Sequence, residues 1–499
     1  MRLQIPVDAA TVPRIPAVGA LVAEGPDGHG QPPALAPTSG DEAVSGRAWR
    51  ALAVAALGTV LVGFNSTATN IALNDIRTTF AGASAAEVGW GVAGYLIGTA
   101  AFLPLGGRLA DRLGRKRVFQ SGLLLFAISA VLSAIAPTVW TLNLARVLQA
   151  VAGAAVLPAS LSLVLPLFPE SRRTTAVGLW SAAGPLAAAV APVGAALILG
   201  VGGWRTVYLV SAPMALAMFA MGALLLDELP TPKVTSRLDL LGASAGTLAI
   251  ACIVAALMQG GTQWGMTSPI TLAVGSAGVT ALAIFVANSL RHPEPLLNLR
   301  LLRLPGVRVA NLANFLIGIT SLSIWLVWPL FLREVWQFSN LGVGLGLTVG
   351  PIAAGTSTLV FSRIGDRIGP IALCRLGAAL QTFAVAWHFT HLDHEVNFWV
   401  DFVPGIALYG IGWGMSTPLL NSIALSWVDE KFYGETNGLF NTLRYVAAAL
   451  GTAAVFALLI DRGADDLADY DSVLFFFVMA SLAGFVSLWL PGARSRPSS

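Results

Sequence analysis

Apolar runs of about 20 residues recur along the chain, and each is long enough to cross the hydrocarbon core of a membrane as a helix. They extend from Trp49 to Pro491. A backbone surrounded by lipid must satisfy its polar groups internally, which a helix does. The runs lack the alternating pattern, about ten residues long, of a membrane β-strand. The sequence therefore predicts an all-α, polytopic membrane protein.

The composition agrees with this class. Of the 499 residues, 56% are hydrophobic and 11% are charged, whereas about 25% are charged in soluble proteins. A net charge of +3 does not indicate a nucleic-acid partner. Cys252 and Cys374 form no disulfide framework, and with no metal-ligand cluster we expect no bound metal. We find no glycine-rich phosphate loop and no nucleophile–base pair, so we expect neither ATP use nor an enzyme.

We predict fourteen spans. They cover residues 49–72, 88–107, 118–136, 140–165, 176–200, 205–226, 239–259, 269–288, 308–332, 341–362, 371–389, 397–421, 437–460 and 472–490. The predicted organisation is a disordered tail (1–47), a six-span half (48–228), a linker with two inserted spans (229–292), a second six-span half (293–491) and a tail (492–499). We expect a monomer embedded in the bilayer of the plasma (inner) membrane.

The first 47 residues hold seven Pro and six Gly and show no periodic apolar face, which is typical of a disordered tail. They also lack the apolar core of a secretory signal peptide. A regulatory or sorting role and a passive tail both remain open for this segment.

Basic residues predict the orientation of the chain, because cytoplasmic connections carry an excess of Lys and Arg. Most of them fall on the side that bears both termini, and the other side holds only Arg77, Arg205, Arg333 and Arg462. Both termini are therefore expected in the cytoplasm.

The two ends of the chain repeat each other. "GRLADRLG" at Gly107–Gly114 matches "SRIGDRIG" at Ser362–Gly369, and "AAVLPAS" around Pro158 matches "MSTPLLN" around Pro418. "GLW" at Gly178 then matches "GLF", again at nearly the same offset along the chain. Three matches in order indicate a duplicated half, and duplicated halves place a substrate site at their interface near the midplane.

The motifs resemble one particular family. "GGRLADRLGRKRVF" is similar to the loop 2–3 signature of the major facilitator superfamily. "RLDLLG", "QGGTQWGMTSP" and "GLFNTLRYVAAALG" resemble segments of its fourteen-span drug:proton antiporters. The likeness runs from about Trp49 to Pro491. It implies two pseudo-symmetric halves, alternating access, small organic substrates and coupling to protons.

The same resemblance implies a conformational latch at Gly107, Asp111, Arg112 and Glu170. Asp111 would face the N-terminus of the thirteenth span, where the helix dipole favours an anion. Arg112 would pair with Glu170, and the contacts would hold the outward-facing state. The neighbouring Arg115, Lys116 and Arg117 are better explained as charges that set the topology.

Arg146 is a charge inside a predicted span, and such charges indicate a functional site. At 1.5 Å per residue it lies about 9 Å from the outer boundary, and Asn65 lies about 10 Å from it. The two side chains are thus expected in one layer. In the family that the chain resembles, a carboxylate of the first span cooperates with this Arg in proton coupling. Here the position carries Asn65, which cannot titrate but can accept a hydrogen bond.

No Asp or Glu lies in the middle of a predicted span. Asp75, Glu87 and Asp401 are at outer edges, and the last two are expected as solvated helix N-termini. His388 is placed at a span end, so no midplane histidine relay is predicted. The sequence therefore names no side chain for proton coupling.

A substrate site is predicted from polar and aromatic residues of both halves: Asn65, Thr69, Asn70, Arg146, Gln149, Trp180, Trp325, Asn421, Asn441 and Arg444. Arg444 would either neutralise an anionic substrate or pair with Asn441. Pro185, Pro192 and Gly194 are expected to shape a gating helix, because small residues let helices approach closely. Each of these residues has packing between helices as its alternative role.

The leading hypothesis is an exporter of hydrophobic drugs or secondary metabolites that works by alternating access. The alternative is a proton-independent facilitator or uptake carrier for an anionic organic solute. A transport-inactive relative that acts as a sensor is a third class.

Overall fold

The computed structural model describes residues 44–228, 239–429, 432–459 and 467–491, apart from the side chains of some residues between 170 and 185 and of 362–367. The predicted tails up to residue 43 and from 492, and residues 229–238 of the predicted linker, lie outside this part. The long helices are α1 (Gly46–Thr79), α2 (Ala85–Leu113), α3 (Arg115–Ala134), α4 (Val139–Val164), α5 (Glu170–Leu225), α6 (Leu240–Gln259), α7 (Pro269–Arg291), α8 (Pro305–Ser321), α9 (Ile324–Glu334), α10 (Asn340–Ile368), α11 (Pro370–His391), α12 (Val403–Ser426), α13 (Tyr433–Leu459) and α14 (Leu467–Ser487). Short turns lie at η1 (Leu165–Leu167), η2 (Gly260–Trp264), η3 (Leu299–Arg303) and η4 (Phe398–Phe402).

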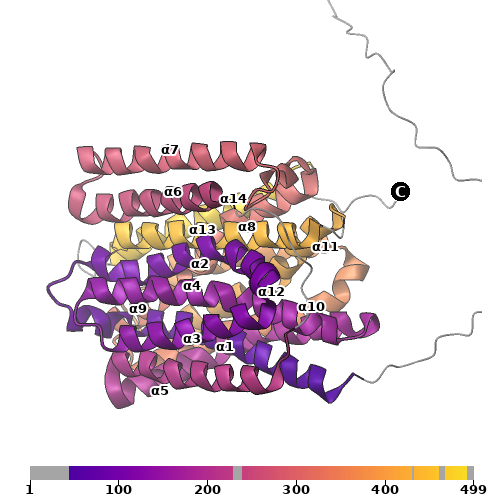
Figure 1. Cartoon of the computed structure of the whole chain (residues 1–499). Coiled ribbons are helices and arrows are strands. Elements are labelled where there is room, and N and C mark those ends of the chain that lie inside the picture. Colours follow the sequence, from indigo (N-terminus) through magenta and orange to yellow (C-terminus); the bar gives the residue numbers. More distant parts are fainter. Residues whose placement is uncertain (1–43, 229–238, 430–431, 460–466, 492–499) are drawn as a thin grey trace, which may run out of the picture. The chain divides into compact units, whose positions relative to one another are not determined.

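The described residues form an almost entirely helical bundle (Figure 1). Within them, 12 helices are long and apolar enough to cross a membrane. The all-helical membrane fold predicted from the apolar runs is confirmed at this level.

Two helices differ from the predicted boundaries. The predicted fifth and sixth spans join in α5, a run of 56 residues whose direction changes at Gly203, where the backbone is non-helical with φ of 70°. The predicted ninth span is confirmed as one candidate span, Pro305–Glu334, but its helix is interrupted, because α8 ends at Ser321 and α9 begins at Ile324. Serine hydroxyls compete for backbone carbonyls at this break: Ser321 donates to Gly318 (3.4 Å) and Ser323 to Ala448 of α13 (3.0 Å).

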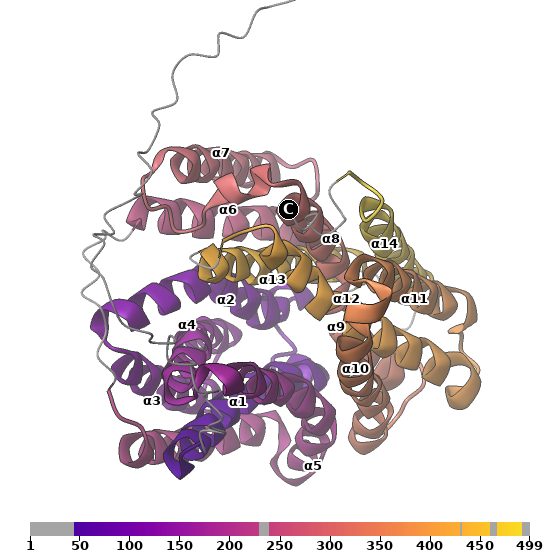
Figure 2. The ribbon, with the colours of Figure 1, turned by 90° about the vertical axis from the view of Figure 1, so that its right-hand side faces the viewer.

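The internal repeat is visible in the backbone. Gly114 joins α2 to α3 with φ of 103°, and Gly369, its match in the repeat, joins α10 to α11 with φ of 92°. Residues with a Cβ rarely adopt these angles, which explains glycine at both positions. The neighbours also correspond, since α4 packs on α2 and α3 while α12 packs on α10 and α11. Figure 2 shows the N-terminal helices α1–α5 and the C-terminal helices α8–α14 as two groups.

We name the two ends of the bundle by landmarks. The basic end is where α2 meets α3, beside Arg115–Arg117, and the distal end is where α1 meets α2. The two groups of helices touch through α2 with α13 and through α5 with α10. Two of these contacts lie toward the distal end, where a Cβ on Gly89 would lie 2.8 Å from Phe456 and one on Gly344 would lie 2.7 Å from the carbonyl oxygen of Pro192.

Helices α6 and α7 pack on each other at the edge of the bundle, and α6 also contacts α2 and α13 (Figure 1). Asp239 fixes this pair. Its carboxylate accepts hydrogen bonds from the backbone N–H of Gly242 (2.8 Å), from the amide of Asn288 on α7 (2.8 Å) and from the N–H of Leu296 (3.0 Å). Burial opposes ionisation, but these donors outweigh it and lower the pKa of Asp239.

Candidate functional site

Arg146 of α4 is 1% exposed and reaches two neighbouring helices. Its Nη1 donates to Oδ1 of Asn65 on α1 and to Oε1 of Gln149, one turn further along α4 (2.5 Å). Its Nε donates to the carbonyl oxygen of Gly91 on α2 (3.3 Å). The predicted proximity of Arg146 and Asn65 is confirmed. Arg146 forms no ion pair with any residue that the structure describes.

Aromatic rings complete the surroundings of this guanidinium. Its carbon lies 4.3 Å from the ring centre of Tyr95 and 5.6 Å from that of Tyr208. Ring faces are weakly negative and attract a cation. The hydroxyl of Tyr95 and Nε2 of Gln149 are buried and have no hydrogen-bond partner. The cluster thus provides donors and π faces around the charge, but no carboxylate.

Asn65 and Thr69 join this cluster to α5. Asn65 Nδ2 donates to Ser211 Oγ (3.2 Å), Thr69 donates to the carbonyl of Asn65 (2.9 Å), and Tyr208 donates to Thr69 (3.3 Å). Asn65 is 0% exposed and Thr69 is 2% exposed. Both therefore lie inside the packed N-terminal helices in this conformation, whereas the sequence predicted that they line a cavity.

A second polar cluster surrounds Arg444 of α13. Its Nη2 donates to Oδ1 of Asn441 (2.9 Å), which confirms the pairing expected as one of its two roles. The amides of Asn441 and of Asn421, on α12, both donate to Oδ1 of Asn437 (3.0 Å each). Arg444 Nε is buried without a partner. The arrangement resembles that around Arg146, because each arginine donates to a side-chain amide oxygen and each cluster contains a buried donor without a hydrogen-bond partner.

The two clusters meet across the contact between α2 and α13. The guanidinium of Arg444 lies 5.7 Å from the ring of Tyr445. Tyr445 belongs to α13, which packs on α2, the helix that carries Tyr95. Tyr95, which packs on Arg146, and Arg444 thus lie on the two helices that join the groups.

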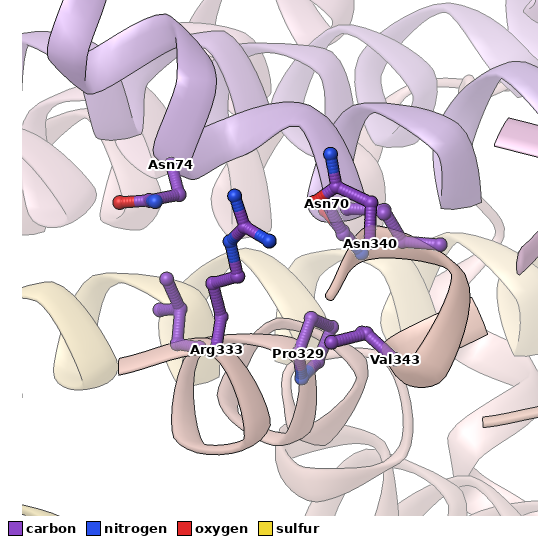
Figure 3. A pocket seen from close by; sticks show the side chains of 8 residues that line it. Asn70, Asn74, Pro329, Arg333, Asn340 and Val343 are labelled. Carbon is purple, nitrogen blue, oxygen red and sulfur yellow. The ribbon is translucent and has the colours of Figure 1, made fainter. Parts of the chain in front are cut away.

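Asn70 lies apart from these clusters, in a pocket toward the distal end (Figure 3). The pocket is lined by Asn70, Ile71 and Asn74 of α1, Pro329, Leu330 and Arg333 of α9, and Asn340 and Val343 of α10. Arg333 points between Asn74 and Asn70 in this view. The pocket joins both groups of helices, but at a different depth from Arg146.

Charged residues connect the two groups at the distal end. Arg77 of α1 forms an ion pair with Glu334 of α9 (2.8 Å), and Asp75 lies 3.9 Å from Arg333. Glu334 also accepts a hydrogen bond from Tyr470 of α14 (3.1 Å). We call these five residues the distal charge cluster.

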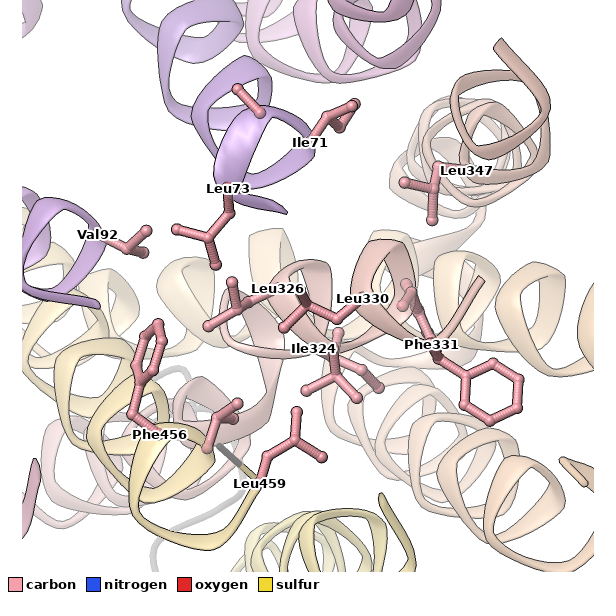
Figure 4. Packing of buried hydrophobic residues seen from close by; sticks show 14 of the residues in the cluster. Ile71, Leu73, Val92, Ile324, Leu326, Leu330, Phe331, Leu347, Phe456 and Leu459 are labelled. Carbon is pink, nitrogen blue, oxygen red and sulfur yellow. The ribbon is translucent and has the colours of Figure 1, made fainter. Parts of the chain in front are cut away.

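An apolar layer lies beneath the distal charge cluster (Figure 4). Ile71 and Leu73 of α1 face Leu326 and Leu330 of α9. Leu73, Leu326 and Leu330 are at most 2% exposed. These packed side chains fill the space between α1 and α9 at this level, next to the pocket at Asn70.

The remaining predicted site residues are dispersed. Trp180 donates to Ser160 (3.0 Å), toward the basic end, and the Trp325 ring packs edge-on to that of Trp328 (5.0 Å). On α5, Gly194 faces Phe64 of α1, where an added Cβ would lie 3.2 Å from the ring. Pro192 is buried next to α10, whereas the side chain of Pro185 lies outside the described residues.

The predicted latch is only partly covered by the described side chains. Asp111 is half-exposed, and its one ion pair within the described part of the chain is with Arg115 (3.7 Å). The predicted partner of Arg112 is Glu170, whose side chain lies outside the described residues. A Cβ on Gly107 would only touch Pro158 (3.7 Å). The latch therefore stays a prediction.

His388 lies in the last turn of α11, so its predicted place at a span end is confirmed, whereas the prediction of a solvated Asp401 is wrong. His388 is fully buried: Trp328 Nε1 donates to its Nδ1 (3.1 Å), and its Nε2 lies 3.0 Å from the carbonyl of Phe402. Asp401 is only 8% exposed, because η4 folds it against α11, where Trp387 donates to its carbonyl. Glu87 does cap the N-terminus of α2, through Ser84, as expected.

Comparisons with known proteins agree with this architecture. The profile of the Major Facilitator Superfamily matches residues 55–290 and 310–499. The puromycin resistance protein of Streptomyces alboniger is 30% identical over 459 residues, which cover 87% of this chain and 88% of that protein. The tetracenomycin C resistance and export protein of Streptomyces glaucescens is 27% identical over 447 residues, covering 88% and 81%.

Solved structures share the fold. The xylose transporter of E. coli, in a partially occluded inward-open conformation, superposes with a TM-score of 0.63 at 16% identity and covers 89% of this chain and 98% of that one. A D-xylose–proton symporter gives a TM-score of 0.66 at 17% identity, covering 90% and 99%. With the repeated halves, the distal closure and a profile that matches most of the sequence, the chain belongs to the Major Facilitator Superfamily and is a membrane transporter.

Proposed function

We propose that the chain exports small hydrophobic organic molecules, either antibiotics or the cell's own secondary metabolites. Relatives of nearly the same length are named as resistance proteins for puromycin and for methylenomycin A and as a tetracenomycin C exporter. Aromatic and amide side chains from both groups of helices suit amphipathic organic molecules.

The observation that carries this proposal is the asymmetry between the two ends. The distal end is closed by ion pairs and an apolar layer between α1 and α9. At the basic end, the one ion pair of Asp111 among the described residues is with Arg115, in the same group of helices, and Arg108 of α2 donates to the backbone carbonyls of Glu294 and Pro295. An alternating-access transporter needs contacts at each end that break in turn. We infer that this conformation opens toward the basic end.

We further propose the finer topology. Counting both arms of α5 and adding α12 to the spans that qualify by composition gives fourteen crossings. In this arrangement α6 and α7 are the inserted pair between two six-helix halves, and the basic end with both termini faces the cytoplasm. The protein would work as a monomer in the plasma membrane, surrounded by lipid.

A resistance and accumulation assay tests the proposal. Cells that lack their own exporters and express the chain should tolerate more puromycin, tetracenomycin C or methylenomycin A, and should accumulate less of at least one compound. The Arg146→Ala variant should reach the membrane but lose this effect. Higher accumulation with the wild-type chain would instead show uptake, and equal accumulation of all three compounds would contradict export of this class.

A further inference from the structure

Two positively charged side chains lie inside membrane-spanning helices. Arg146 and Arg444 lie well within α4 and α13, and neither pairs with a carboxylate among the described residues. A charge removed from water is strongly unfavourable unless it is paired. Among the described residues, the buried Arg146 and the partly buried Arg444 therefore have no carboxylate as counter-charge.

The neighbouring groups leave hydrogen-bond donors unused. The Tyr95 hydroxyl, Gln149 Nε2 and Arg444 Nε are all buried without partners. Tyr95 is 3% exposed and Gln149 is 0% exposed. Native proteins seldom leave such groups unpaired unless a ligand or water completes them. The unpaired acceptors nearby are amide oxygens of Asn143 and Asn421, and these cannot offset a positive charge.

The unused donors lie next to the junction of the two groups of helices. Tyr95 of α2 packs on Arg146, α2 packs on α13, and on α13 Arg444 lies beside Tyr445. A ligand with negative charge and several acceptor atoms, bound where α2 meets α13, would pair with the cations and also satisfy the donors. A cationic ligand would be repelled by both arginines.

We propose that the substrate is an amphipathic organic anion held between Arg146 and Arg444, and that the membrane potential drives its export. This rests on the proposed export function and adds the charge of the substrate and the driving force. The position in α1 where a titrating acid would be needed carries Asn65, which already accepts from Arg146. An anion that leaves a cell with a negative interior moves down the potential, so no exchanged proton is required.

The potential is sufficient as a driving force. Moving one charge through about 100 mV supports a concentration ratio of about 50-fold. A dianion would square that ratio. The export would carry net negative charge outward, and its rate would follow the voltage rather than the pH difference.

Two aromatic dyes of opposite charge test this inference in proteoliposomes of the full chain. Fluorescein is anionic and ethidium is cationic, and uptake of each is measured at equal pH inside and outside. A potassium gradient with valinomycin sets the potential, positive or negative inside. We expect fluorescein to accumulate when the interior is positive and to be depleted when it is negative, and an imposed pH gradient alone to have little effect.

Variants assign the effect to the two arginines. Arg146→Gln and Arg444→Gln should each slow fluorescein uptake about tenfold or more, because each loses a charge-assisted hydrogen bond. Tyr95→Phe should slow it by a smaller factor. Arg303→Gln, which removes the same charge from an exposed turn, is the matched control and should behave as wild type. If the Arg146 variant does not fold, the Arg444 variant and the voltage response of the wild type still decide.

The possible outcomes distinguish the anion proposal from the proposed export function. Ethidium transport without fluorescein transport would overturn the anion proposal and leave the export function intact. Fluorescein transport that follows the pH gradient and ignores the voltage would overturn the driving force. Transport of neither dye, together with no resistance in cells, would contradict both the inference and the proposed function.

Discussion

At the scale of single residues, Arg146 is held by the amide of Asn65 where an acid-coupled transporter would need a carboxylate. The amide oxygen of Asn65 accepts from the guanidinium but leaves its charge in place. Tyr95 and Tyr208 stabilise that charge through their ring faces and do not cancel it. In the proposed mechanism this charge binds the anionic substrate.

Asn65→Asp should convert this site into an internal ion pair. Asp has the same shape as Asn, so the fold should persist, while the new carboxylate competes with an anionic substrate for Arg146. We expect fluorescein transport in proteoliposomes to fall about tenfold, the cost of one charge-assisted hydrogen bond. Size-exclusion profiles should match the wild type, and unaltered fluorescein transport would show that Arg146 does not bind the anion.

Sequence reasoning reached some of these residues and not others. Helical rise along α1 and α4 was enough to place Asn65 beside Arg146, because depth in a membrane helix follows residue number. It could not show that Ser211 and Tyr208 of α5 would enclose them, since that depends on how distant helices pack. The burial of His388 was missed for the same reason: its partner Trp328 comes from α9.

At the scale of elements, the closure of the distal end rests on α1, α9 and α14. Glu334 connects all three through Arg77 and Tyr470. Arg77 and Glu334 are 26% and 10% exposed, so solvent screens their ion pair only in part. Neither partner was predicted to pair, because the sequence does not show that the C-terminal ends of α1 and α9 meet.

Glu334→Gln should shift the protein toward distal opening. Losing about 1 kcal/mol of ion-pair energy raises the open population about fivefold. A cysteine at Leu73, in the apolar layer, should then react about fivefold faster with a membrane-impermeant thiol reagent, with Cys252 and Cys374 replaced by Ser. Glu395→Gln, at an exposed position, is the control. Equal labelling rates in the Glu334→Gln and Glu395→Gln variants would show that the ion pair of Arg77 with Glu334 does not hold the distal end closed.

Asp239→Asn should loosen α6 and α7 from the loop at Leu296. The change replaces an acceptor of three hydrogen bonds with a poorer one and should cost about 1–3 kcal/mol, seen as a lower melting temperature. Because the pKa of Asp239 is lowered in the folded protein, its stabilisation is complete at neutral pH and is lost as the pH falls through that lowered value. The wild type should therefore lose more stability than the variant on acidification. Curves of melting temperature against pH that run parallel for the two proteins would show that Asp239 does not hold α6 and α7 to the loop.

At the scale of the whole molecule, the all-helical class and the duplicated plan were predictable, because span length and the glycine at the end of each repeat are local properties. Gly114 and Gly369 confirm the repeat through their positive φ. The conformational state was not predictable. It depends on which contacts between the two halves are formed, and charged residues that could form such contacts occur at both ends of the bundle.

Alternating access is the central claim of this account. Two distances measured between spin labels test it most directly in the full chain in lipid: one pair joins the distal ends of α1 and α9 at Thr78 and Val335, and the other joins the basic ends of α2 and α10 at Leu113 and Ile368. Saturating substrate should lengthen the first distance while it shortens the second, as the halves rock about the site between Arg146 and Arg444. Two distances that change in the same direction, or neither changing while substrate is transported, would contradict the mechanism.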